Sequence, residues 1–312
     1  MGSRGLVIPK SRYNLMMGPV VLLGMACVGC GTFSIQLPGI GNVPAGYNLP
    51  GGEAIIPFTS MGGYVVVDVL INDAGPYKFI LDTGASISVV SPAVAAKLPQ
   101  TFTGTTSIVS NVDPNSVSTR FILIDHLSVG PAQFDRLQAA ILPAIRATFE
   151  GQTIFIDGIL GIPLFQNLLL TVDYPANVVL VSTSGAPTPD GCSVLRTMRG
   201  PGDLPSLELD IDGRMVLAVI DTGNNEFLLL PESFSDLSFV GPVQTGMATT
   251  VTGTLETTRG ILDGNITTGC QTFSQPTITV GGGIASIGAG LLSQYKVTID
   301  QLSHVIWFHS AI

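Results

Sequence analysis

The chain has 312 residues, 46% of them apolar and only 11% charged, and its formal net charge is −9. So few charges, together with 37 glycines and 21 prolines, exclude a disordered chain and favour a protein of strands and turns. The acidic balance argues against nucleic acid as a partner. Three histidines without an HExxH pattern leave a built-in zinc site without ligands, so no metal is expected.

The first 29 residues are typical of a secretory signal. Three basic residues precede an apolar stretch at 15–28 that is short and interrupted by glycine and proline. Its end resembles the lipobox of bacterial lipoproteins, in which the cysteine that follows a small residue is lipidated. Cys30 fits that position, which predicts a lipid anchor to a bacterial membrane and a location in the periplasm or at the cell surface. An uncleaved membrane anchor and a plain secretion signal are the alternatives.

Residues 30–52 are rich in proline and glycine and follow no period. We interpret them as a tether between the membrane and the folded part. Beyond the tether the only cysteines are Cys192 and Cys270. They form either a structural disulfide or two buried thiols, because sequence does not show the distance between them.

The remaining chain repeats one order of features twice. Residues 63–98 and 206–237 each hold an apolar strand, a polar turn with glycine, and a second apolar strand that runs into Asp-Thr-Gly. A second shared block follows each copy, at 157–181 and 285–308, where an apolar-apolar-Gly step precedes a short helix and a hairpin. The chain is therefore expected to be a duplicated lobe.

Asp-Thr-Gly begins at Asp82 in the first copy and at Asp221 in the second. One such triplet is a common turn, but two at equivalent points of an internal repeat are a specific signal. On these residues the chain resembles the aspartic protease superfamily, especially its retropepsin-like bacterial proteins with both lobes fused. The resemblance covers about residues 53–312. It implies a mostly β fold of two homologous acid-protease β-barrel lobes, 53–184 and 185–312, related by a pseudo-two-fold axis.

The resemblance also assigns roles to the two triplets. It implies that Asp82 and Asp221 are the catalytic pair, an aspartyl dyad at the centre of the axis. The threonines that follow would lock the two loops together, and the glycines would allow close backbone approach. These supporting residues are Thr83, Gly84, Thr222 and Gly223.

Two carboxylates are required for the chemistry that this dyad implies. Held about 3 Å apart they cannot both ionise, so they share one proton. The charged one activates a water, and the protonated one hydrogen-bonds the scissile carbonyl and later protonates the leaving amine. The predicted function is an aspartic endopeptidase that needs no metal or other cofactor. Its substrate is an extended polypeptide, and one chain carries both halves of the site, which predicts a monomer.

A β-hairpin flap covers the substrate in the family. Residues 103–130 have two arms rich in Ser, Thr and Val, so we expect the first flap here, with Asn111, Val112 and Asp113 at its substrate-binding tip. Residues 245–256 lie at a comparable point of the second lobe. Ordinary solvent-exposed hairpins are the alternative interpretation.

The second triplet departs from the family pattern. Asn224 and Asn225 follow it where small or hydroxyl residues are expected. Asn224 could donate to the outer carboxylate oxygen, or it could crowd the floor of the cleft. A rival hypothesis is therefore a non-catalytic peptide-binding lipoprotein with an acid-protease fold.

The histidines give no competing catalytic pattern. All three follow apolar strand residues without a surrounding Ser-His-Asp sequence, so they are interpreted as structural or surface residues: His126, His304 and His309. No GxSxG is present for an α/β-hydrolase nucleophile.

Overall fold

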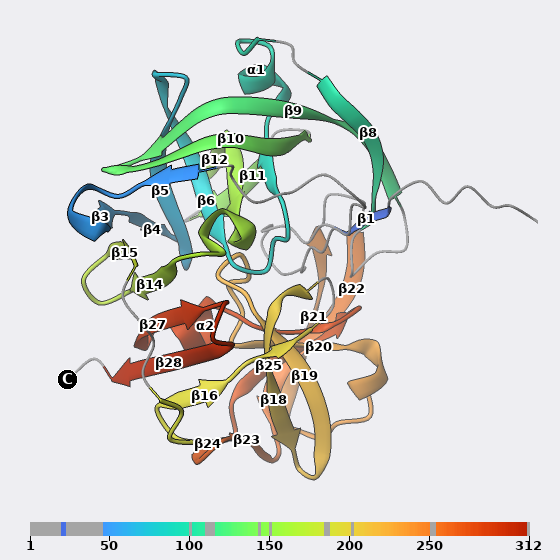
Figure 1. Ribbon diagram of the computed structural model, residues 1–312. Helices are drawn as coiled ribbons and strands as arrows, with labels where there is room; N and C mark the ends of the chain where they lie inside the picture. Colours follow the sequence, from blue (N-terminus) through green and yellow to red (C-terminus); the bar gives the residue numbers. More distant parts are fainter. Residues whose placement is uncertain are drawn as a thin grey trace, which may run out of the picture.

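The computed structural model places two β-rich halves of the chain one against the other (Figure 1). In Figure 1 the N-terminal half, coloured blue to green, lies above the C-terminal half, coloured yellow to red. The structure therefore confirms the prediction of a mostly β chain with two lobes. The structure describes residues 20–22, 46–99, 102–109, 116–142, 145–149, 152–183, 188–200, 203–249 and 254–310.

The N-terminal lobe is built on a ten-stranded sheet. Six of its strands close into a barrel in the order β9, β10, β7, β13, β6 and β5, because β5 also pairs with β9. The strands of this sheet are β1 (Val20–Leu22), β2 (Gly46–Asn48), β4 (Thr59–Met61), β5 (Tyr64–Ile71), β6 (Ala74–Asp82), β7 (Ser88–Val90), β8 (Phe102–Val109), β9 (Ser116–Val129), β10 (Ala132–Ile141) and β13 (Gly158–Gly161). A separate hairpin joins β11 (Ile145–Phe149) and β12 (Gln152–Ile156).

The C-terminal lobe repeats this order, and among the described residues its sheet stays open. Its strands β18, β19, β20 and β26 pair as β5, β6, β7 and β13 do in the first lobe. The strands of this ten-stranded sheet are β17 (Met198–Arg199), β18 (Pro205–Ile211), β19 (Arg214–Ile220), β20 (Leu228–Pro231), β21 (Phe239–Thr249), β22 (Thr254–Leu262), β23 (Asn265–Thr268), β24 (Gln271–Ser274), β25 (Thr277–Gly282) and β26 (Ala285–Ile287).

Local sequence explains the first hairpin of each lobe. Asn72 and Asp73 have φ of 49° and 64°, the backbone of a type I′ turn that fits the twist of two paired strands. Asp212 and Gly213 form the equivalent turn, with φ of 49° and 86°. The first turn is short, because the next strand already begins at Ala74.

A third, six-stranded sheet joins the lobes. The N-terminal half contributes β3 (Glu53–Pro57), β14 (Leu169–Asp173) and β15 (Val178–Ser182), and the C-terminal half contributes β16 (Val194–Arg196), β27 (Tyr295–Asp300) and β28 (Val305–Ser310). At its centre β14 and β27 pair antiparallel, with Thr171 opposite Thr298. The two hydroxyl oxygens are 2.8 Å apart. The repeat makes Thr171 and Thr298 equivalent residues, so the pseudo-two-fold axis passes between them.

Helices are few and short in the described residues. α1 (Pro92–Ala95) begins with proline at its first position, and the Ser91 hydroxyl caps it by accepting a hydrogen bond from the Val94 amide at 3.3 Å. The others are α2 (Ala289–Leu292) and the 3₁₀ turns η1 (Pro50–Gly52), η2 (Ile162–Phe165) and η4 (Glu232–Phe234). None of the helices in this part of the chain is long and apolar enough to cross a membrane.

The end of the predicted tether belongs to the fold. Gly46–Asn48 forms β2, which pairs with β10, and Leu49 is buried in the core. Residues 46–52 therefore pack on the first lobe, and the prediction of a tether was wrong for them. Their composition is typical of a linker, but their backbone pairs with a strand of the lobe. Earlier in the chain, β1 pairs in parallel with β8. Removal of residues 1–29 stays a prediction, and Cys30 lies outside the described residues.

Cys192 and Cys270 form a disulfide, with their Cα atoms 4.9 Å apart. It joins the segment that leads into β16 to the turn between β23 and β24. The two cysteines are 78 residues apart, so the bond restricts a long loop of the unfolded chain.

Loss of this bond is expected to destabilise the protein. The double variant Cys192→Ala/Cys270→Ala should lose about 2–4 kcal/mol of unfolding free energy, measured by denaturant titration. Reductant should destabilise the original chain by a similar amount and leave the variant unchanged. Equal stability of variant and original chain would contradict a structural role for the bond.

Candidate active site

The two predicted aspartates lie at equivalent strand ends. Asp82 is the last residue of β6, where β13 pairs with it in register, Gly161 opposite Asp82. Asp221 directly follows β19, and its amide donates to the carbonyl oxygen of Ile287 at 2.9 Å. Both side chains are buried, with 1% exposure at Asp82 and none at Asp221. The two lobes thus bring their Asp-Thr-Gly loops to one place.

The two threonines join these loops by reciprocal hydrogen bonds. The Thr83 amide donates to Oγ1 of Thr222, and the Thr222 amide donates to Oγ1 of Thr83, each at 3.0 Å. Each hydroxyl then donates across the axis to a backbone carbonyl, of Ile220 and of Leu81 respectively, at 2.7 Å. All four bonds are buried, so the loops have little freedom to move apart.

The glycines hold the carboxylates by their amides and by their lack of a side chain. The Gly84 amide donates to Oδ1 of Asp82 at 2.8 Å, and the Gly223 amide donates to Oδ1 of Asp221 at 3.0 Å. A Cβ atom on Gly84 would lie 2.5 Å from Cγ of Asp221, and one on Gly223 would lie 2.3 Å from Cγ of Asp82. Each glycine therefore lies directly against the carboxylate of the opposite loop.

Burial controls the protonation of this pair. It raises the pKa of Asp82 from 3.8 to about 7, against the opposing effect of hydrogen bonds from Asp221 and the backbone amides. Burial, and next the charge of Asp82, raises the pKa of Asp221 well above its ordinary value. Both directions follow from two close carboxyl groups away from water, which retain one shared proton at neutral pH.

The comparisons with known proteins agree with this geometry. Residues 67–164, which include the first Asp-Thr-Gly loop, match the family model described as aspartyl protease. The solved aspartic proteinase from Irpex lacteus superposes with a TM-score of 0.50 at 13% sequence identity, over 83% of this chain and 97% of that one. The chain has the fold of an aspartic proteinase. No curated protein matches it in sequence.

The aspartic proteinase fold confirms the predicted fold class. The family model and the shared fold both support a protease in general. The roles of the individual residues at the dyad are not tested by these similarities and stay predictions.

Raised pKa values in this fold predict a stability cost at neutral pH. Asp221 in the native state keeps its proton above the pH at which the unfolded chain releases it. The contribution of the Asp221 carboxyl group to the free energy of unfolding is therefore greatest below about pH 4 and falls as pH rises. Because asparagine is neutral at every pH, Asp221→Asn is expected to be more stable than the original chain at pH 7, by roughly 1–4 kcal/mol.

Thermal unfolding at pH 3.5 and pH 7 tests this, and the difference should vanish at the lower pH. Asp68→Asn is the matched control, because the Asp68 side chain is 56% exposed. A lower unfolding temperature of Asp221→Asn at pH 7 would contradict the raised pKa.

The Asn224 side chain is held between Ser286 and the Glu226 amide. It is fully buried, and its Nδ2 donates to Oγ of Ser286 at 2.8 Å. Its Oδ1 accepts from the Glu226 amide at 2.8 Å. Ser286 was missed by the sequence analysis, although one signal was present: it is a polar residue inside the apolar block that precedes Gly288.

The predicted flaps are only partly described. Asn111, Val112 and Asp113 lie outside the described residues, between strands β8 and β9, which pair up to Val109 opposite Ser116. In the second lobe β21 and β22 form the other predicted hairpin. Paired strands are present at both predicted positions, and their role as flaps stays a prediction.

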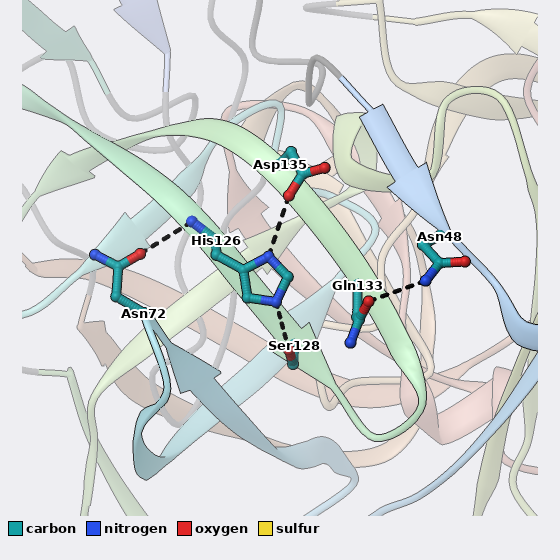
Figure 2. Close-up of polar contacts among 6 residues, drawn as sticks. All are labelled: Asn48, Asn72, His126, Ser128, Gln133 and Asp135. Atoms are coloured by element: carbon teal, nitrogen blue, oxygen red, sulfur yellow. Dashed lines mark hydrogen bonds and ion pairs between the residues drawn. The ribbon is translucent and has the colours of Figure 1, made fainter.

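His126 lies in a polar cluster on the hairpin of β9 and β10 (Figure 2). Its Nδ1 is 3.1 Å from Oδ1 of Asp135, and its Nε2 is 3.3 Å from Oγ of Ser128. A Ser-His-Asp row therefore exists in space, which the local sequence did not show. The Asp135 side chain is 58% exposed, so solvent screens its charge. His126 was predicted to be a structural or surface residue, and its side chain is 34% exposed.

Across the described ranges, no group of three or more His, Cys, Asp or Glu side chains could hold a metal ion.

Proposed function

We propose that this protein is an aspartic endopeptidase with Asp82 and Asp221 as its catalytic dyad. The observation that carries the proposal is the meeting of two buried carboxyl groups at the end of two equivalent strands, fixed by the threonine hydrogen bonds. Such a pair cannot ionise twice, so it presents one base to the attacking water and one acid to the scissile carbonyl oxygen.

Each member of the pair has a separate role in the proposed reaction. In this proposal Asp82 is the ionised base that removes a proton from the attacking water. Asp221 keeps its proton, donates a hydrogen bond to the scissile carbonyl, and so stabilises the negative charge that develops there. Asp221 then protonates the leaving amine, and the proton taken by Asp82 remains as the one shared proton of the dyad, so no covalent intermediate forms.

Oxygen atoms are available for these contacts. Oδ2 of Asp82 and Oδ2 of Asp221 are buried and have no regular hydrogen-bond partner among the described residues. Their Oδ1 atoms, by contrast, are held by the glycine amides. In our proposal the two Oδ2 atoms are therefore the ones that contact water and substrate.

The substrate class we propose is an extended polypeptide. The paired arms β8–β9 and β21–β22 supply one long hairpin from each lobe. An extended peptide laid between them can add backbone hydrogen bonds as a strand does. Because both aspartates come from one chain, we propose that a monomer is active.

We propose a location at a bacterial membrane through lipid on Cys30, facing the periplasm or the cell surface. The sequence at Cys30 and the disulfide support it, since disulfides persist in oxidising compartments. Mass spectrometry of the protein purified from membranes tests the proposal, because lipidation would give a diacylglycerol-modified peptide that begins at Cys30.

Cleavage of an unfolded protein mixture by the full chain tests the proposed function. Products are identified by mass spectrometry between pH 3 and 7, beside Asp82→Asn as the inactive variant. Internal cleavage that depends on Asp82 supports an endopeptidase. Peptide binding without cleavage by a folded chain would overturn it in favour of the non-catalytic peptide-binding lipoprotein.

A further inference from the structure

A chain of polar groups approaches Asp221 from the side of β26. Asn224 and Ser286 are both fully buried, and their side chains are joined by the 2.8 Å hydrogen bond from Nδ2 to Oγ. The Asn224 backbone is fixed as well, because its carbonyl oxygen accepts from the Ala289 amide at 2.7 Å. A Cβ atom on Gly288 would lie 2.8 Å from Cγ of Asn224. The asparagine amide is therefore packed in one place.

The hydrogen bonds of this chain run in one direction. The Glu226 amide can only donate, so the Asn224 atom that it contacts at 2.8 Å must be the carbonyl oxygen. The amide nitrogen then faces Ser286 and donates to its hydroxyl oxygen. The hydroxyl hydrogen of Ser286 remains to be donated. Ser286 pairs with Val219 where β26 lies beside β19, and Asp221 follows Val219 by two residues, so the two side chains lie on one face of the sheet. The neighbouring acceptor is therefore the carboxyl group of Asp221, whose pKa the hydroxyl lowers.

The first lobe has apolar residues at the two equivalent positions. Superposing the two repeats on Gly161 and Gly288 places Ile159 where the second lobe has Ser286. Ala85 stands where the second lobe has Asn224. Neither side chain can donate a hydrogen bond. The pseudo-symmetric loops thus treat the two aspartates differently.

We propose that Asn224 and Ser286 are positioning residues, which orient Asp221 through a one-way hydrogen-bond relay and make the two aspartates inequivalent. The effect on catalysis rests on the proposed endopeptidase function. The relay explains why asparagine is accommodated after the second Asp-Thr-Gly: it acts on Asp221 through Ser286.

The relay has a defined effect on pH dependence. A donor to a carboxylate stabilises its charged form, so removal of the Ser286 hydroxyl must raise the pKa of Asp221. In the active state Asp221 carries the proton, and its loss sets the alkaline limb of the activity profile. Ser286→Ala is therefore expected to move the alkaline limb of kcat/KM upward by about 0.5–1 pH unit. At the same time kcat should fall about tenfold while KM changes less than about twofold.

Two further variants keep this test independent of a general packing defect. Asn224→Leu, of nearly equal size, removes the donor to Ser286 and should shift the alkaline limb in the same direction. The double variant should shift it no further than Ser286→Ala alone, because the two residues act in one chain. Ser206→Ala is the matched control, a fully buried serine of the same lobe whose hydroxyl donates to the carbonyl of Leu204. An unchanged alkaline limb, additive shifts, or an equal shift in the control would overturn the relay.

A second measurement separates this inference from the proposed function. The pH dependence of the unfolding temperature reports the pKa of Asp221 without any cleavage. Even if the chain cleaves nothing, native Asp221 should keep its proton to a higher pH in Ser286→Ala than in the original chain. The fall of the unfolding temperature with rising pH should therefore extend to higher pH in this variant. Identical profiles of Ser286→Ala and the original chain would overturn the relay, whereas absent cleavage alone would overturn only the protease.

Discussion

Asp82→Asn and Asp221→Asn are each expected to lower kcat/KM for peptide hydrolysis by at least about 10³-fold. Asparagine keeps the shape of the side chain and its hydrogen bond from the glycine amide, but it cannot hold or release the shared proton. Without Asp82 no group removes a proton from water. Without Asp221 no acid stands at the carbonyl oxygen. Because the two act as one unit, the double variant should be no less active than either single variant.

The measurement is kcat/KM on one purified peptide product of the original chain, taken at its optimal pH. Asp68→Asn, an exposed carboxylate paired with Lys78 at 2.6 Å, is the control and should retain full activity. Activity of either dyad variant within about tenfold of the original chain would place the chemistry elsewhere.

Gly84→Ala and Gly223→Ala are expected to lower kcat/KM by at least about 100-fold and stability by about 1–3 kcal/mol. The new Cβ atoms would lie 2.5 and 2.3 Å from Cγ of the opposite aspartate, far inside van der Waals contact. The loops cannot separate without breaking the buried bonds between Thr83 and Thr222. The aspartates must therefore move apart or rotate, and the two carboxyl groups can then no longer share one proton.

Activity and thermal unfolding of the same two variants check this prediction. Gly46→Ala is a suitable control, because a Cβ atom there would meet only Oδ2 of Asp135, at 3.7 Å. A fully active Gly84→Ala or Gly223→Ala would show that the carboxylates are not held as closely as the structure has them.

Features that repeat within the sequence could be predicted from it. The two Asp-Thr-Gly triplets at equivalent points gave the pair Asp82 and Asp221, which the structure brings together. The second shared block also makes Thr171 and Thr298 equivalent, and these two residues face each other in the joining sheet. Repetition is informative because each copy supports the interpretation of the other.

Features that depend on unrepeated contacts could not be predicted. Asn224 contacts Ser286, 62 residues further along the chain, so the local sequence showed only an unusual residue. Asp135 reaches His126 because β9 and β10 pair, and no motif at either residue indicates it. The closeness of Cys192 and Cys270 likewise requires the complete fold.

The sheet between the lobes has a consequence for how such a chain can diverge. Its central strands, β14 and β27, are equivalent segments that pair with each other, so one lobe alone would expose an edge that complements a second copy of itself. When the two lobes are joined in one chain, each lobe is held at a high effective concentration near the other, so their pairing no longer depends on the protein concentration. In a dimer of identical lobes every substitution occurs twice. In the fused chain Asn224 and Ser286 occur once, so one aspartate can be tuned while the other is left unchanged.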